Sequence, residues 1–420
     1  MCVPLDRLYN FLHDVCNHRD LIIYGFFPHG SRKITDLGNF TVFLTDDVIA
    51  GSDKLWNTSY QYVRQNILFM HDQEPLNFDL YSSPDVFESL YPDFKIIEGQ
   101  DEFITSMVKS LVGKIIHHLN FKIIFCFFLY KIPVLLVHSE KRSSNLEKYQ
   151  NIDFVGVYWW CHGMIARDWF RYAQHDVLLS KRMPQKDFLI YNRAWAGTRE
   201  YRLKFAELVV DHDMYSYCKM GFNSEDSIDY REHQFQNKKF QIQRQDLEQY
   251  FFNNTSGSNS SANYCAHDYQ TTNLEVVLET LFDDDRLHLT EKILRPIACG
   301  HPFILVATQG SLEYLRSYGF KTFDNIIDET YDTIADPAQR LQAILIEMKR
   351  IAMLPHDAKQ QVYDALRSIA AYNQQRFFSV GWHDQLISEF KQNFDSAVVD
   401  YNQRMQSLFA LPTDKSIPIS

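Results

Sequence analysis

Several features that define other classes of protein are missing from this 420-residue sequence. Its seven cysteines, an odd number scattered from Cys2 to Cys299, form neither a disulfide framework nor the spacing of a metal site. The most apolar run, 121–137, is cut by Lys131 and Pro133 into pieces too short to span a bilayer. The N-terminus also lacks the basic and apolar regions of a secretory signal. We therefore expect a cytoplasmic protein with no membrane span.

Familiar catalytic and nucleotide-binding signatures are missing as well. The sequence contains no G-x-G-x-x-G, no P-loop, no nucleophile elbow and no H-E-x-x-H zinc motif. A formal net charge of −11 argues against a broad nucleic-acid surface, because such surfaces are usually basic. No internal repeat is found. The hydrophobic content of 45% is ample for globular cores, and the length favours two domains.

Short apolar runs alternate with helical patterns along most of the chain, which predicts a mostly parallel α/β sheet in each half. The predicted strands of the first half are 21–27, 40–44, 66–70, 121–130, 134–137 and 153–158, with helices at 5–19 and 102–119. In the second half, strands are predicted at 188–191 and 303–306, with helices at 198–210, 311–319, 336–353, 357–376 and 383–408. Pro184 and neighbouring basic residues interrupt the pattern and divide the chain into segments 1–183, 184–380 and 381–420.

The stretch 289–306 reads as a short helix followed by a buried strand. Thr290 is a good N-cap, and Gly300 suits the position just past a helix end. Residues 303–306 then form a short apolar run of strand type.

The first turn of this predicted helix carries charges that a structural helix does not need. Glu291 and Lys292 lie where free backbone N–H groups and the positive end of the helix dipole favour anions. Arg295 follows one turn later on the same face as Glu291. A carboxylate for sugar hydroxyls beside cations for phosphate suits a nucleotide diphosphate. The alternative is an ordinary surface ion pair between Glu291 and Arg295.

Two short strings carry a resemblance to a known family, namely Leu278-Glu279-Thr280 and Thr290-Glu291-Lys292. Together they resemble the donor-site signature of the α-1,3-fucosyltransferases, in which similar residues contact the nucleotide sugar. The longer string through Pro302-Phe303-Ile304 also resembles uncharacterised glycosyltransferases encoded by bacteriophages, which would place the protein in the cytoplasm of an infected cell.

This resemblance implies two Rossmann-like domains facing each other, the GT-B fold, with a helical C-terminal tail that packs back on the first domain. The first domain (1–183) would hold the acceptor and the second (184–380) the donor, without a metal and with inversion at the transferred sugar. The donor contacts that it implies are Glu279, Thr290, Glu291 and Lys292. Thr280, where the family often has Asn, and Pro296, which interrupts the helix, leave the sugar and the nucleotide open.

Asp72 and Glu74 follow the predicted strand 66–70, at the end where parallel sheets bind ligands. A carboxylate there can act as the general base for an acceptor hydroxyl. The fucosyltransferase family has a carboxylate-rich turn followed by Pro and Asn-Phe near this point, and the string 74–78 (Glu-Pro-Leu-Asn-Phe) is similar to it. Glu74 is therefore favoured, with Asp72 as the alternative acid and a plain polar turn as the structural alternative.

Three arginines lie around the first strand-to-helix turn of the second half: Arg193, Arg199 and Arg202. A guanidinium there can hold a diphosphate and stabilise the leaving group. We favour Arg193 and then Arg199 for this role, and the alternative is ordinary solvated helix charge.

The remaining candidates are on the acceptor side. His71, His138 and Glu140 follow or end predicted strands and are candidate acceptor contacts. The aromatic segment 158–169 either lines an acceptor cleft or belongs to a core. The acidic run 283–285 is interpreted as a solvated turn, not as a metal site.

The sequence as a whole predicts a glycosyltransferase that moves a sugar from a nucleotide-diphosphate sugar to the hydroxyl of a carbohydrate or other acceptor. Two alternatives stay open: a non-catalytic carbohydrate- or nucleotide-binding protein on the same scaffold, and an enzyme that glycosylates modified bases in viral DNA. The acidic net charge weighs against the second alternative. No metal or other cofactor is expected.

Overall fold

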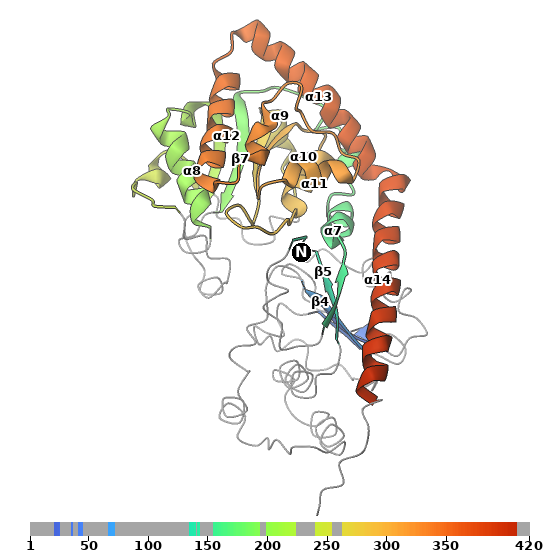
Figure 1. Ribbon diagram of the computed structural model, residues 1–420. Helices are drawn as coiled ribbons and strands as arrows, with labels where there is room; N and C mark the ends of the chain where they lie inside the picture. The colour runs from blue at the N-terminus through green and yellow to red at the C-terminus, as the bar shows by residue number, and fades with distance from the viewer. Residues whose placement is uncertain are drawn as a thin grey trace, which may run out of the picture. The chain divides into compact units, whose positions relative to one another are not determined.

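Figure 1 shows the computed structural model of the protein, which describes residues 21–25, 35–36, 41–44, 66–71, 134–139, 141–142, 154–193, 199–223, 240–253 and 263–409. The chain divides into two compact units. What is called here the C-terminal unit contains 140–143 and 160–387, and the N-terminal unit contains the described parts of 2–139, 144–159 and 388–420. This division differs from the predicted boundary at 183/184, because residues 160–183 belong with the C-terminal unit.

The described part of the N-terminal unit holds a six-stranded sheet with the order β2-β3-β1-β4-β5-β6. Its strands are β1 (Leu21–Gly25), β2 (Thr35–Asp36), β3 (Thr41–Leu44), β4 (Asn66–His71), β5 (Val134–His138) and β6 (Phe154–Tyr158). Every neighbouring pair is parallel except β2 with β3. Five of the predicted strands are therefore confirmed, whereas the predicted helices at 5–19 and 102–119 and the predicted strand at 121–130 lie outside the described residues.

The C-terminal unit is built on a parallel sheet with the described order β11-β10-β7-β8-β9. Its strands are β7 (Lys186–Arg193), β8 (Cys218–Asn223), β9 (Phe252–Asn253), β10 (Thr272–Leu278) and β11 (Phe303–Val306). All four residues of β11 are buried, as expected for a strand covered on both faces. The sequence predicted β7 and β11 but missed β8, β9 and β10, which include polar residues.

Helices cover both faces of this sheet, so the unit has a three-layer α/β/α arrangement. Figure 1 shows α8 and α12 together on one side of β7, and α10, α7 and α13 on the other. The helix bounds are α7 (Cys161–Trp169), α8 (Glu200–Asp211), α9 (Ala266–Gln270), α10 (Glu291–Ala298), α11 (Ser311–Ser317), α12 (Pro337–Ala352), α13 (His356–Phe378) and α14 (Val380–Phe409). The N-cap of α8 is Arg199, without a side-chain capping bond, and Thr198, where the predicted helix 198–210 begins, lies outside the described residues.

The last helix, α14, passes from the C-terminal unit to the N-terminal unit at residue 388. Beyond that point the Asn393 amide donates to the Tyr158 carbonyl at 2.7 Å, and the Phe390 ring lies 4.7 Å from the Trp159 ring, centroid to centroid. The end of β6 and the second part of α14 are therefore packed together within the N-terminal unit.

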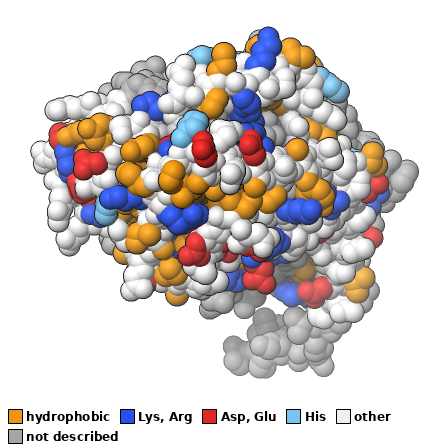
Figure 2. Space-filling view, turned by 90° about the horizontal axis from the view of Figure 1, so that it is seen from above, with side chains coloured by type: hydrophobic (Ala, Val, Ile, Leu, Met, Phe, Trp, Pro, Cys, Tyr) orange, Lys and Arg blue, Asp and Glu red, His pale blue; other side chains and the backbone are white. Residues whose placement is uncertain are grey.

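The surface mixes apolar and charged side chains. On the face that Figure 2 shows, hydrophobic side chains lie between basic and acidic ones, and the two signs of charge are interspersed. Over the ranges that the structure describes, no helix combines the length and the apolarity needed to cross a membrane.

Candidate functional site

Helix α10 begins and ends as its sequence predicts. The Thr290 hydroxyl accepts a hydrogen bond from the Lys292 backbone N–H at 3.3 Å, which makes Thr290 the N-cap. At the other end Gly300 has a φ of 62°, a left-handed conformation that glycine adopts without strain. The charged first turn is thus fixed directly beyond the carboxyl end of β10.

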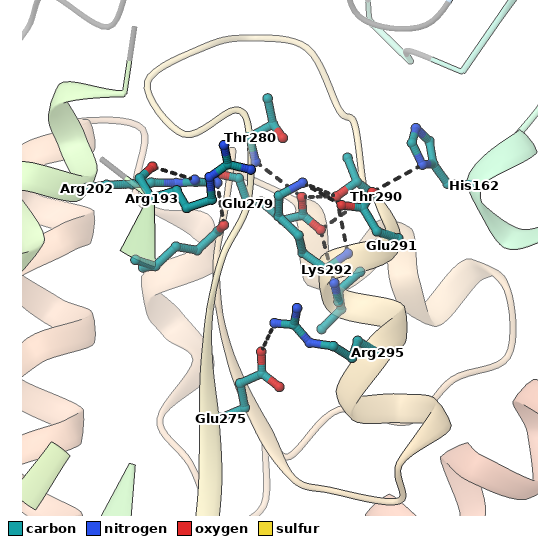
Figure 3. A network of polar contacts seen from close by, with 12 residues as sticks. His162, Arg193, Arg202, Glu275, Glu279, Thr280, Thr290, Glu291, Lys292 and Arg295 are labelled. Carbon is teal, nitrogen blue, oxygen red and sulfur yellow. Dashed lines mark hydrogen bonds and ion pairs between the residues drawn. The ribbon is translucent and has the colours of Figure 1, made fainter. Parts of the chain in front are cut away.

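Glu279, the residue immediately after β10, occupies the N-terminus of α10. Its side chain is fully buried, and its Oε1 accepts from the backbone N–H groups of Thr290 at 3.0 Å and Ile293 at 3.3 Å. Its Oε2 accepts from the Thr290 hydroxyl at 2.7 Å and from the Thr280 N–H at 3.2 Å (Figure 3). The expectation of free N–H groups for an anionic ligand at this turn is therefore corrected, because a carboxylate of the chain itself binds them. Glu279 joins strand to helix and is not itself free for the donor.

Removing this carboxylate should destabilise the protein. Glu279→Ala is expected to lower the free energy of unfolding by about 2–3 kcal/mol, because buried N–H groups lose a charged acceptor and the helix loses a cap. Urea denaturation measures the difference. Glu313→Ala is the matched control, since Glu313 is an exposed acid in the first turn of α11. An equal loss in both variants would contradict the capping role.

Glu291 and Lys292 form an ion pair beside this cap, in which the carboxylate is buried and the lysine is partly exposed. The Lys292 ammonium lies 2.9 Å from Oε1 of Glu291 and also donates to the Thr290 hydroxyl at 3.2 Å. Burial lowers the pKa of Lys292, the carboxylates of Glu291 and Glu279 raise it, and two nearby arginines lower it again, so the net direction is downward. A bound anion would oppose this shift and favour the charged ammonium.

Arg202 connects the ends of two strands. Its guanidinium, on α8 and only 2% exposed, donates to the carbonyls of Arg193 at 2.9 Å, Leu278 at 2.7 Å and Glu279 at 2.9 Å. Because Arg193 ends β7 and Leu278 ends β10, these bonds fix the carboxyl ends of both strands to α8. Arg202 therefore positions the sheet edge, a role that the sequence pattern did not reveal.

Arg193 and Arg199 lie at the same edge. Arg193 is the last residue of β7, Arg199 is the N-cap of α8, and both are partly exposed. Arg199 lies near enough to Lys292 to lower the pKa of its ammonium. Figure 3 shows Arg193 beside Arg202 and Glu279. The structure therefore brings the predicted donor cations Arg193, Arg199 and Lys292 to the carboxyl ends of β7 and β10.

Arg295 is placed elsewhere, and this removes it from the candidate donor contacts. Its guanidinium lies 2.7 Å from the Glu275 carboxylate, donates to the Tyr269 hydroxyl at 3.1 Å and stacks 4.2 Å above the Tyr191 ring. Burial opposes its charge, but the Glu275 carboxylate outweighs burial and keeps the pKa of Arg295 well above its usual value. Arg295 points at the middle of β10, so it forms neither a donor contact nor the surface pair with Glu291.

The acidic run 283–285 forms internal contacts. Arg286 pairs with Asp284 at 2.6 Å. Burial opposes ionisation of Asp284, but the Arg286 hydrogen bonds outweigh it and lower the pKa of this carboxyl to about 2. In the described residues no group of three or more His, Cys, Asp or Glu side chains could hold a metal ion. Independence from metal stays a prediction.

The predicted base and acceptor residues are described only in part. Asp72, Glu74 and Glu140 lie outside the described residues, so their roles stay predictions. His71 and His138 end β4 and β5, and the parallel register pairs them directly. Their backbones therefore lie next to each other at the carboxyl edge of the N-terminal sheet. Their side chains are not among the described parts of the structure.

The aromatic segment after β6 belongs to the interior. Trp159 and Trp160 are fully buried, and the Trp160 indole N–H donates to the Leu289 carbonyl at 2.7 Å. The next helix, α7, brings Nδ1 of His162 to 3.6 Å from Oε2 of Glu291. Sequence reasoning missed both of these contacts with residues 289–291, because no spacing links residues so far apart in the chain.

Comparisons of the chain with protein-family models, with curated proteins and with solved structures found no match. The arrangement of side chains at the carboxyl edge of the C-terminal sheet therefore carries the functional argument.

Proposed function

We propose that this protein is a glycosyltransferase that uses a nucleotide-diphosphate sugar, and that its two α/β units are Rossmann-like domains of the GT-B type. In open parallel sheets, ligands bind beyond the carboxyl ends of the strands. At that edge the C-terminal unit collects Arg193, Arg199 and Lys292 around two buried carboxylates. Cations for a diphosphate beside a carboxylate for hydroxyl groups are the chemistry that a nucleotide sugar requires.

The proposed reaction is a single displacement with inversion. The acceptor oxygen attacks the anomeric carbon of the donor sugar, and the bond from that carbon to the diphosphate oxygen breaks. The acceptor proton passes to Glu74, or to Asp72 as the alternative. The nucleoside diphosphate leaves with the bonding electron pair, and Lys292 and the arginines stabilise its negative charge.

The observation that carries this proposal is the position of Lys292. Its ammonium is held beyond the end of β10, partly buried, between the Glu291 carboxylate and the Thr290 hydroxyl. Helix capping does not need an ammonium there, because Glu279 and Thr290 already bind the N–H groups of the first turn. Glu291 pairs with this ammonium, and Arg199 and Arg202 add further positive charge beside it, which a polyanionic ligand would balance.

Lys292→Ala tests this position. The substitution is expected to weaken binding of a nucleoside diphosphate by about 1.5–3 kcal/mol, the value of a charged hydrogen bond. Titration calorimetry with GDP and UDP measures the change. Lys349→Ala, which removes an exposed lysine from α12, is the matched control and should leave affinity unchanged. Unchanged affinity in Lys292→Ala, with the fold intact, would contradict the assignment.

The reaction class is tested by a panel of nucleotide sugars. A ligand that binds only the native state raises thermal stability by mass action, so the true donor should stand out in a melting screen. The stabilising donor is then assayed for hydrolysis and for transfer to carbohydrate acceptors. Binding without hydrolysis or transfer would favour the non-catalytic binding protein, and no stabilisation by any member of the panel would overturn the proposal.

A further inference from the structure

The extended segment that leads into α10 is held at alternate residues. Leu287 and Lys141 exchange two backbone hydrogen bonds, of 2.9 and 2.8 Å, as an isolated antiparallel bridge. Two residues later the Leu289 carbonyl accepts from the Trp160 indole at 2.7 Å. After two further residues, Oε2 of Glu291 meets His162. The backbone of Leu287, the carbonyl of Leu289 and the carboxylate of Glu291 therefore each have a contact. Only the contact of Glu291 involves a side chain of the proposed site.

His162 and Lys292 lie beside opposite oxygens of the same carboxylate. Oε1 of Glu291 lies 2.9 Å from the Lys292 ammonium, and Oε2 lies 3.6 Å from Nδ1 of His162. Figure 3 shows His162 reaching Glu291 from α7, a different element from the one that carries Lys292. The His162 ring also packs edge-on against His288, with centroids 5.0 Å apart. The two contacts come from two different elements, and together they favour one orientation of the carboxylate.

The helix that carries His162 is itself fixed closely. Gly163 has no side chain, and a Cβ there would lie 2.7 Å from the Leu386 side chain and 3.2 Å from the Trp382 ring. The glycine therefore permits close contact between α7 and the start of α14. His162 is presented by a rigid element, so its distance to Glu291 is set by packing rather than by a mobile loop.

Packing alone does not account for a polar pair at this place. His162 and Glu291 are both almost completely buried, with side chains 3% and 2% exposed. Burial of an ionisable pair costs desolvation energy, and a well-packed apolar pair of similar volume is often at least as stable. Of the other buried positions of α7, Ile165 and Ala166 are apolar, and Asp168 is the second polar one. His162 is the polar residue of α7 that contacts Glu291, next to the proposed donor cations, where a carboxylate of defined orientation can bind a ligand hydroxyl.

We infer that His162 is a positioning residue of the proposed donor site, which orients the Glu291 carboxylate toward the nucleoside part of the donor while Lys292 and the arginines bind the diphosphate. This inference rests on the proposed function. In this inference Glu291 binds the nucleoside and the cations bind the diphosphate. A substitution of His162 should therefore weaken binding of the nucleoside part only. Inorganic pyrophosphate reports the diphosphate half, and GDP and UDP report both halves together.

The experiment compares these ligands by titration calorimetry in five variants: His162→Phe, His162→Gln, Glu291→Gln, the double variant His162→Phe/Glu291→Gln, and His301→Gln. His162→Phe should weaken the tighter-binding nucleotide about tenfold and leave pyrophosphate within about twofold. His162→Gln, which retains an N–H donor, should recover most of the nucleotide affinity. In the Glu291→Gln background the His162 change should cost nothing further, because the group that it orients is gone.

His301→Gln controls for the loss of a buried histidine. His301 follows the other end of α10, is 1% exposed and contacts Arg182, far in the fold from Glu291. It should leave both affinities unchanged. Equal losses of nucleotide and pyrophosphate in His162→Phe, or no loss at all, would overturn the inference while leaving the proposed function intact. If the unaltered protein binds neither nucleotide, the proposed function fails, and the inference fails with it.

Discussion

Arg295→Met should lower the free energy of unfolding by about 3–5 kcal/mol, because it leaves the buried Glu275 carboxylate without its cation. Glu275 is 1% exposed and accepts from Arg295 at 2.7 Å and from the Tyr269 hydroxyl at 2.7 Å. Burial raises the pKa of Glu275, which agrees with a carboxylate that depends on its partner for charge. Urea denaturation monitored by tryptophan fluorescence measures the loss.

A second substitution should recover part of this loss. In Glu275→Gln/Arg295→Met the buried charge is removed from both sides and an amide remains for Tyr269, so the double variant should be more stable than Arg295→Met alone. Arg367→Met is the control, since the Arg367–Asp364 pair lies on α13 with side chains 27% and 60% exposed. It should change the unfolding free energy by less than about 1 kcal/mol. Similar effects for Arg295→Met and Arg367→Met would contradict a structural role for the buried pair.

Glu74→Gln should reduce sugar transfer by roughly 10²–10⁴-fold, the usual contribution of a general base. The amide keeps the shape of the side chain but cannot take the acceptor proton. Pro75 follows at once and biases Glu74 toward an extended backbone, which suits a residue that leaves the strand at the ligand-binding edge. Transfer is measured with the donor identified in the melting screen, and donor affinity should change little.

Asp72→Asn separates the two candidate acids. If Glu74→Gln keeps near-normal turnover and Asp72→Asn is inactive, Asp72 is the base. If both variants keep full activity, the turn 72–75 is structural and the proposed mechanism has no base.

Short-range sequence patterns were enough to predict the helices and strands whose ends are determined by residues within or next to the element. Helix α10 and strand β11 were found because Thr290, Gly300 and the apolar run 303–306 each act within a few residues. The strands β1, β3, β4, β5 and β6 were found for the same reason. In a parallel sheet, continuous apolar runs carry the signal.

Contacts between distant residues were beyond such reasoning. Strand β10 was missed because Glu275 interrupts its apolar run, and the cation that makes a buried glutamate tolerable comes from α10. The capping role of Glu279 depends on β10 ending beside the start of α10, which no spacing reveals. Arg295 was expected at the ligand edge because it shares a helix face with Glu291, but its long side chain turns to the middle of the sheet instead.

The contacts of residues 287–291, which lead into α10, also determine where the chain can be divided for expression. Lys141, Trp160 and His162, which fix Leu287, Leu289 and Glu291, all precede residue 184, the domain boundary that the sequence suggests. A fragment that starts there would keep the described strands β7 to β11 of the C-terminal sheet and still lose the residues that contact its proposed donor site. It would also expose the ring faces of Tyr314 and Tyr318 that Trp160 covers. Expression of this half alone should therefore begin before Lys141. Residues that support the proposed donor site of the C-terminal unit lie in the part of the sequence that the predicted boundary assigns to the N-terminal domain.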